Sequence, residues 1–159
     1  MSIRPLQLTP RLLAAASFIR PGDRVLDIGT DHARLPVFLM EHGLCGSATA
    51  ADLSEGPLAR AVRTVRAHRL EGRITLLLRD GAEGFSPEEF DTVTITGMGA
   101  DTILSIISKS PWLLEKRLIL QPQTRVDGFA EMIGREPLEH KIVNEKHRKY
   151  HIYLFVGAI

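Results

Sequence analysis

Acidic residues recur in this sequence where short hydrophobic runs end. Asp27 and Asp31 lie in the segment DIGTDHA that begins at Asp27, and Asp52 and Asp80 follow the next two runs. If each run is a strand of one parallel sheet, these side chains share the edge where open α/β sheets bind ligands. A single aspartate at such a place is often only a turn former or a helix cap. Several of them in register favour a ligand site.

The chemistry of that edge suits a cationic ligand better than a dinucleotide. Dinucleotide-binding loops need glycine two residues after the first motif glycine, where this sequence has Asp31. A carboxylate there would repel a pyrophosphate, which disfavours NAD, NADP and FAD. S-adenosyl-L-methionine instead carries a sulfonium and an ammonium, which Asp27 and Asp31 would attract. Asp52 could accept hydrogen bonds from its ribose, and Asp80 from its adenine amine.

The predicted cofactor site combines these acids with the small and apolar residues beside them. Its members are Asp27, Gly29, Asp31, Asp52, Leu53, Asp80, Gly81, Gly97 and Met98. The two glycines of Gly97-Met98-Gly99 would let a flat base approach the backbone. The alternative for this segment is a tight turn with Met98 in the core. Cys45 precedes its strand, at the wrong end of the sheet for a catalytic nucleophile.

Composition indicates one folded domain over residues 1–159. Hydrophobic residues make up 44% and charged residues 25%, and the net charge is +1. No apolar run could span a bilayer, and the N-terminus lacks the pattern of a signal peptide, so we expect a cytoplasmic protein, monomeric or weakly dimeric. No HExxH motif or cysteine–histidine ligand spacing occurs, so we expect no metal site.

Strand-like and helix-like segments alternate along the chain, which is typical of crossover units on a parallel sheet. Strands are predicted at 24–28, 47–51, 74–78, 92–95 and 117–120, with a closing antiparallel hairpin of 138–144 and 151–156. Helices are predicted at 6–18, at 35–41, after an N-cap at Ser54, at 100–107 and at 126–133. The predicted fold is α/β and Rossmann-like: the seven-stranded, mostly parallel sheet of a class I methyltransferase, with helices on both faces.

These motifs resemble those of the bacterial tRNA (adenine-22 N1)-methyltransferases, over about residues 8–156. Asp27-Ile-Gly-Thr-Asp-His-Ala-Arg-Leu-Pro36 resembles the family's DIGSDHAYLP, and Arg79-Asp80-Gly81 resembles its GDG. Thr96-Gly-Met-Gly-Ala100 is similar to its CGMGG, and Leu120-Gln-Pro-Gln123 to its LQPN. The aspartate–histidine pair in the first motif is unusual among class I methyltransferases.

The resemblance implies an S-adenosylmethionine-dependent enzyme that methylates N1 of an adenine in tRNA, with S-adenosyl-L-homocysteine as the product. It also makes Asp31 a candidate catalytic residue. The sequence departs from the family pattern at Arg34, Ala100 and Gln123, where the family has Tyr, Gly and Asn. Family members carry a helical C-terminal extension, whereas this chain ends at Ile159.

The expected mechanism is a direct in-line transfer of the methyl group to the ring nitrogen. Asp31 is the first candidate to stabilise the cation left on the base, and His32 is the second, with a structural hydrogen bond as the alternative for His32. The predicted substrate-binding residues are Arg34, Gly99, Gln121, Pro122, Gln123, Arg125, Lys146, Arg148 and Lys149. The arginine-rich segment 60–69 is either a solvated face or a phosphate-binding one.

Three other functions compete with this interpretation. A methyltransferase of a small molecule or a protein fits the even net charge. A non-catalytic scaffold that binds S-adenosylmethionine or RNA fits the same motifs. A nicotinamide oxidoreductase is disfavoured by the missing glycines.

Overall fold

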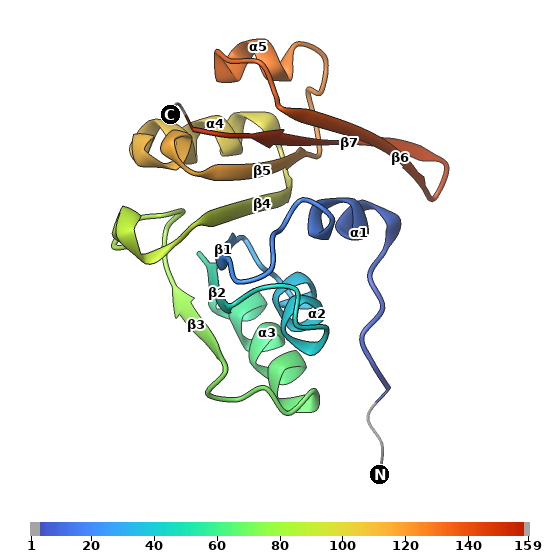
Figure 1. The fold of residues 1–159 in the computed structure, drawn as a ribbon, viewed down its shortest axis with the longest axis vertical. Coiled ribbons are helices and arrows are strands. Elements are labelled where there is room, and N and C mark those ends of the chain that lie inside the picture. The colour runs from blue at the N-terminus through green and yellow to red at the C-terminus, as the bar shows by residue number, and fades with distance from the viewer. Residues whose placement is uncertain (1–3, 158–159) are drawn as a thin grey trace.

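Seven strands form a single sheet in the computed structural model, which describes residues 4–157 (Figure 1). The strands are β1 Arg24–Ile28, β2 Ser47–Asp52, β3 Ile74–Leu78, β4 Thr92–Met98, β5 Arg117–Pro122, β6 Glu139–Glu145 and β7 Arg148–Phe155. Their order is β3-β2-β1-β4-β5-β7-β6. Strands β1 to β5 are parallel, and β7 is antiparallel to both of its neighbours. The predicted Rossmann-like sheet is confirmed.

The helices differ from the prediction mainly at their starts. They are α1 Pro10–Ala16, α2 Arg34–Glu41, α3 Glu55–Ala67, α4 Ala100–Lys109 and α5 Phe129–Ile133, with 3₁₀ turns η1 Pro87–Glu89 and η2 Pro111–Glu115. α1 is shorter than predicted because Pro10 forces the residue before it out of the helical region. α5 begins late because Gly128 has a φ of 76°. Ser54 is the N-cap of α3, but its side chain makes no capping hydrogen bond.

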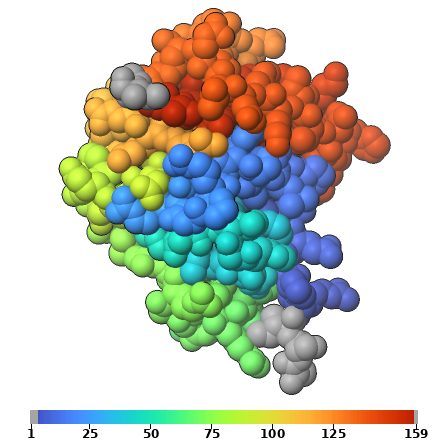
Figure 2. Space-filling view, viewed as in Figure 1, coloured from blue at the N-terminus to red at the C-terminus, as the bar shows by residue number. Residues whose placement is uncertain are grey.

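Two hydrophobic cores cover the two faces of the sheet. In β1, Val25 packs in the core beneath α1, α2 and α3, whereas Leu26 and Ile28 pack in the core beneath α4 and α5. Every residue of β1 after Arg24 is buried, which is typical of a strand covered on both faces. Figure 2 shows the N-terminal residues, in blue, between the red hairpin and the cyan and green segments that follow. No helix among residues 4–157 is long and apolar enough to cross a membrane.

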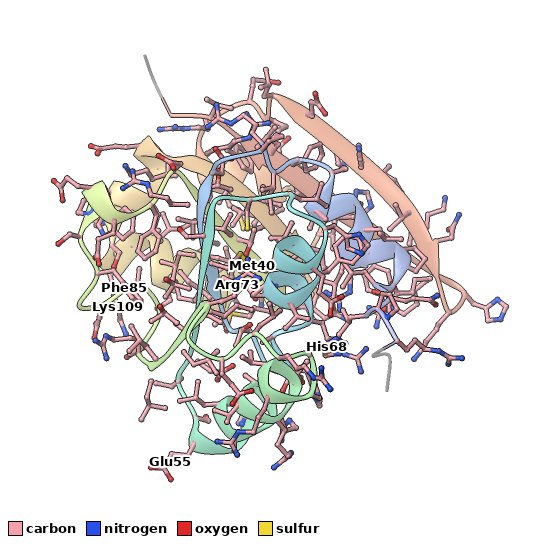
Figure 3. The ribbon with its side chains drawn as sticks, turned by 60° about the horizontal axis from the view of Figure 1, so that its bottom comes forward. Met40, Glu55, His68, Arg73, Phe85 and Lys109 are labelled. Carbon is pink, nitrogen blue, oxygen red and sulfur yellow. The ribbon has the colours of Figure 1, made fainter. Side chains whose placement is uncertain are left out.

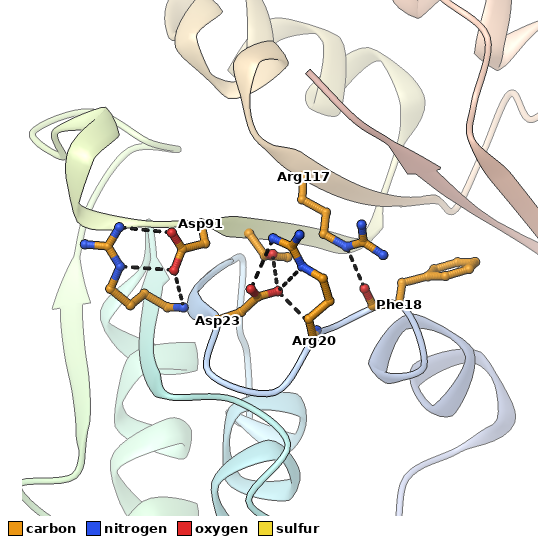
Figure 4. A network of polar contacts seen from close by, with 7 residues as sticks. Phe18, Arg20, Asp23, Asp91 and Arg117 are labelled. Atoms are coloured by element: carbon orange, nitrogen blue, oxygen red, sulfur yellow. Dashed lines mark hydrogen bonds and ion pairs between the residues drawn. The ribbon is translucent and has the colours of Figure 1, made fainter. Parts of the chain in front are cut away.

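Polar residues join the starts of the central strands, at the edge opposite the carboxyl ends (Figure 4). Asp23 is buried and accepts hydrogen bonds from the backbone N–H of Arg20 (3.1 Å) and the hydroxyl of Thr92 (2.8 Å). Arg24 forms an ion pair with Asp91 (3.0 Å), which lowers the pKa of Asp91 to about 2. These contacts tie the connection from α1 to β1 onto the start of β4.

Replacing Asp23 with alanine should lower the free energy of unfolding by about 2–4 kcal/mol, because the buried hydroxyl of Thr92 loses its acceptor. Arg20→Ala is the matched control. The Arg20 side chain is 57% exposed, so its ion pair should be worth under about 1 kcal/mol. Urea denaturation measures both changes in the free energy of unfolding. Equal small losses in the two variants would show that the hydrogen bond from Thr92 to Asp23 does not stabilise the fold.

Candidate functional site

Two cavities adjoin at the carboxyl edge of the sheet, where the strand order reverses between β1 and β4. The apolar cavity, of about 300 Å³, includes Gly29, Leu53, Asp80, Gly81 and Met98. The polar cavity, of about 500 Å³, includes Arg11, Asp27, Gly29, Asp31, His32, Arg34, Gly97 and Lys146. Gly29 lines both. This is the edge at which open α/β sheets bind ligands.

Asp27 lies inside the sheet, on β1, and its side chain forms part of the polar cavity. It is only 4% exposed, and its two carboxylate oxygens accept hydrogen bonds from the hydroxyls of Thr94 and Thr30, each at 2.7 Å. Burial raises the pKa of Asp27 from 3.8 to about 6, and the two hydroxyls limit that rise. The cavity therefore holds a poorly solvated carboxylate, which a cationic ligand would stabilise in its ionised form.

The loop after β1 has an unusual backbone. Asp31 has a φ of 52° and Ala33 a φ of 54°, so both adopt the left-handed conformation that is uncommon for residues other than glycine. Asp52 holds this loop: one of its carboxylate oxygens accepts from the backbone N–H of Asp31 (3.1 Å), and the other from that of Ser54 (3.3 Å). Both oxygens keep a further lone pair, so Asp52 can still accept from a ligand.

Arg60 of α3 binds the carboxylate of Asp31. Its Nη2 and Nε lie 2.8 Å and 3.1 Å from the same oxygen, Oδ1. Asp31 remains 55% exposed, and its other oxygen lies 3.8 Å from Nε2 of His32. Arg60 was not among the predicted site residues. The sequence signal that could have indicated Arg60 is its position in the second turn of α3. This helix follows β2, which is the strand beside β1.

Arg11 and Gln121 form a second support that the sequence analysis missed. Gln121 is fully buried, and its Oε1 accepts from Nη1 of Arg11 (2.7 Å) and from the backbone N–H of Gly97 (2.8 Å). Gln121 and Pro122, which were predicted to contact substrate, are both buried in β5. Gln121 instead fixes Gly97, which has a φ of 76° at a bulge in β4.

The apolar cavity contains the other predicted cofactor residues. Leu53 is exposed toward it, and Asp80 is half-exposed, 3.9 Å from the amine of Lys109. Gly29 has a φ of 71°, and a Cβ there would overlap the methyl group of Met98. Met98 belongs to the end of β4, packs against the core and also lines the apolar cavity.

The remaining predicted substrate residues are more dispersed. Lys146 reaches the polar cavity from the two-residue turn between β6 and β7, where Lys146 and His147 have φ values of 50° and 65°. Arg148 lies over the ring of Tyr150, and Arg125 pairs with Asp101 at 3.5 Å. The predicted site residues that line neither cavity are Asp52, Gly99, Gln121, Pro122, Gln123, Arg125, Arg148 and Lys149. Within residues 4–157, no cluster of three or more acidic, histidine or cysteine side chains could hold a metal ion.

Asp27 should make the stability of the protein depend on pH. Its pKa is higher in the folded state than in the unfolded chain, so between about pH 4 and pH 6 the unfolded chain binds fewer protons. The free energy of unfolding should therefore fall as pH rises through this window. At about 1.4 kcal/mol for each pKa unit, the loss amounts to ~3 kcal/mol.

Urea denaturation of the wild type and Asp27→Asn at several pH values measures this loss. The asparagine does not titrate, so the variant's stability relative to the wild type should increase between pH 4 and pH 7. Parallel pH profiles would show that Asp27 does not carry the effect.

A family model described as a methyltransferase domain matches residues 8–153. The tRNA (adenine(22)-N(1))-methyltransferase of Bacillus subtilis is 34% identical over 133 residues, which are 82% of this chain. The match spans 56% of that protein, so the chain covers little more than half of its relative's length.

Solved structures agree with this match. The Bacillus subtilis m1A22 tRNA methyltransferase has a TM-score of 0.86 at 28% identity, covering 96% of this chain and 68% of that one. A Streptococcus pneumoniae structure in complex with S-adenosyl-L-methionine has a TM-score of 0.87 at 34% identity, covering 96% of this chain and 75% of that one. The resemblance inferred from the motifs is confirmed: the chain belongs to the methyltransferase-domain family and, within it, to the family of the bacterial tRNA (adenine-22 N1)-methyltransferases.

Proposed function

We propose that the chain is an S-adenosylmethionine-dependent methyltransferase that methylates N1 of an adenine in tRNA by direct in-line transfer. The observation that carries the proposal is the buried carboxylate of Asp27, which opens into a polar cavity adjoining an apolar one at the switch in strand order. The relative from Bacillus subtilis supports the choice of reaction and substrate. A tRNA substrate would place the activity in the cytoplasm.

The residues present suit this cofactor. Asp27 offers negative charge to a cationic sulfonium and ammonium, and Gly29, which lines both cavities, leaves room for the methyl group of Met98. We assign the adenosine portion to the apolar cavity, beside Leu53 and Asp80, with Asp52 as the acceptor for the ribose. When bound, S-adenosyl-L-methionine supplies a methyl group activated by its positive sulfur. S-adenosyl-L-homocysteine is the expected product.

Asp31 and His32 are the groups placed to act on the base. Both line the polar cavity, and the carboxylate of Asp31 is more than half exposed. Methylation of N1 leaves a cation on the adenine, and a neighbouring carboxylate stabilises that charge or accepts a proton from N6, which contributes roughly 10²–10⁴-fold. Holding both reactants at the cavity can lower the barrier by a further ~7–11 kcal/mol. The target base must leave its stack to enter the cavity.

Transfer of tritiated methyl from S-adenosyl-L-methionine to unmodified bacterial tRNA tests the proposed activity. Digestion to nucleosides should place the label in 1-methyladenosine. Label in another nucleoside would change the proposed target, and label in added protein or small molecules but not in tRNA would favour the competing methyltransferase functions. Protein that binds S-adenosyl-L-homocysteine without transferring label to tRNA would contradict the proposed substrate.

Two single substitutions should separate catalysis from cofactor binding. Asp31→Ala should reduce turnover by about 100-fold or more while S-adenosyl-L-homocysteine affinity changes only a few-fold, because Asp31 faces the base. Asp52→Ala should instead weaken S-adenosyl-L-homocysteine binding. Asp127→Ala removes an exposed carboxylate that lines neither cavity and serves as the control. Calorimetric titration and the methyl-transfer assay measure the two effects.

Each assignment can fail on its own. An equal loss of affinity and turnover in Asp31→Ala would make Asp31 a cofactor-binding residue. Unchanged S-adenosyl-L-homocysteine affinity in Asp52→Ala would remove the ribose assignment.

A further inference from the structure

A third cavity, of about 320 Å³, lies beside the polar cavity, on the side of α2 and α3. We call it the α2–α3 cleft, and it is lined by Leu6, Arg34, Arg63, Thr64, Ala67 and His68. Arg34 lines the polar cavity as well, so its side chain separates the two. Figure 3 shows His68, at the end of α3, well apart from Lys109, which lines the apolar cavity. The cleft is thus a neighbour of the proposed base site and is remote from the apolar cavity.

The α2–α3 cleft is positively charged. Its lining contains the guanidinium groups of Arg34 and Arg63, both on exposed residues, and no carboxylate, whereas the apolar and polar cavities both include carboxylates. Among residues 4–157, neither of these arginines takes part in an ion pair. The nearby Glu41 is largely buried and is engaged by Nδ1 of His68 and the backbone N–H of Leu6.

The position of Arg34 adds to this positive potential. It is the first residue of α2, an eight-residue helix with no acidic residue in its first turn. The start of a helix carries partial positive charge, so a cation there is unfavourable unless an anion lies nearby. Arg34 and Arg63, which lie on two different helices, therefore together favour the binding of an anion in the cleft. A guanidinium binds phosphate oxygens through a planar pair of N–H donors, which a lysine does not reproduce.

We propose that Arg34 and Arg63 bind a backbone phosphate of the RNA strand next to the target nucleotide. The inference rests on the proposed function, because it assumes that the substrate is RNA. The cofactor assigned above contains no phosphate, so it gives no reason for a phosphate site here. An RNA strand whose base enters the polar cavity must continue across the rim of that cavity, and Arg34 forms part of the rim shared with the cleft. The strand then meets Arg63 on α3.

Binding of unmodified bacterial tRNA to the full chain, measured by fluorescence anisotropy at several salt concentrations with S-adenosyl-L-homocysteine present, tests the assignment. Arg34→Ala and Arg63→Ala should each weaken binding by about fivefold, the upper range for one exposed ion pair. Each should also reduce the slope of log affinity against log salt by about 0.7, the contribution of one phosphate contact. S-adenosyl-L-homocysteine affinity should not change in Arg63→Ala.

Arg73→Ala is the matched control, because Arg73 is also exposed but lines none of the three cavities. Arg63→Lys should keep the salt slope and recover only part of the affinity, since it preserves charge without the planar donor pair. Thermal unfolding of each variant shows that the fold is intact.

The possible failures are distinguishable. If the wild type binds tRNA and the arginine variants differ no more than Arg73→Ala does, the phosphate site is wrong and the proposed function stands. If the wild type neither binds nor methylates tRNA, the proposed RNA substrate is wrong, and the phosphate site falls with it.

Discussion

A carboxylate held inside the sheet governs the geometry of the site. The hydroxyl of Thr94 joins Asp27 to β4, and the hydroxyl of Thr30 joins it to the loop that follows β1. The order of the sheet reverses between β1, which carries Asp27, and β4. An ionised carboxylate in such a place needs hydrogen-bond donors or a cationic ligand, since burial disfavours its charge. The cavity therefore combines a fixed shape with an electrostatic preference for positive charge.

The backbone around Asp27 is strained, and neighbouring side chains hold it in place. Asp31 and Ala33 adopt left-handed conformations, which destabilise residues other than glycine by about 1–2 kcal/mol each. Asp52, at the end of β2, and Arg60, on α3, both hold the loop that follows β1. Gln121 holds Gly97 on the other side of the site. Strain of this kind persists only where surrounding contacts determine the conformation, and such places are often functional sites.

The sequence was informative where the physics is local. Buried strands appear as apolar runs, and their ends are marked by Asp52, Asp80 and Gly97, so the sheet, its ligand-binding edge and several of the cavity residues could be predicted. The supports could not, because they depend on contacts between distant segments: Arg60 reaches Asp31 across 29 positions, and Arg11 reaches Gln121 across 110. The buried position of Gln121, a predicted substrate contact, depends on such a contact as well. A motif shows which residue stands at the edge, but not whether its side chain faces outward.

In the turn between β6 and β7, the residues that would best stabilise the hairpin differ from the residue that brings positive charge to the polar cavity. A two-residue hairpin turn in which both φ values are positive strongly favours the sequence Asn-Gly. This chain has Lys146 and His147 there instead. Replacing them with Asn-Gly would relieve backbone strain and stabilise the hairpin. It would also remove Lys146, the one lysine among residues 4–157 that lines the polar cavity. Stabilising substitutions at functional positions commonly reduce activity. A search for a more thermostable form of this protein would select that exchange early, and would lose the lysine with it.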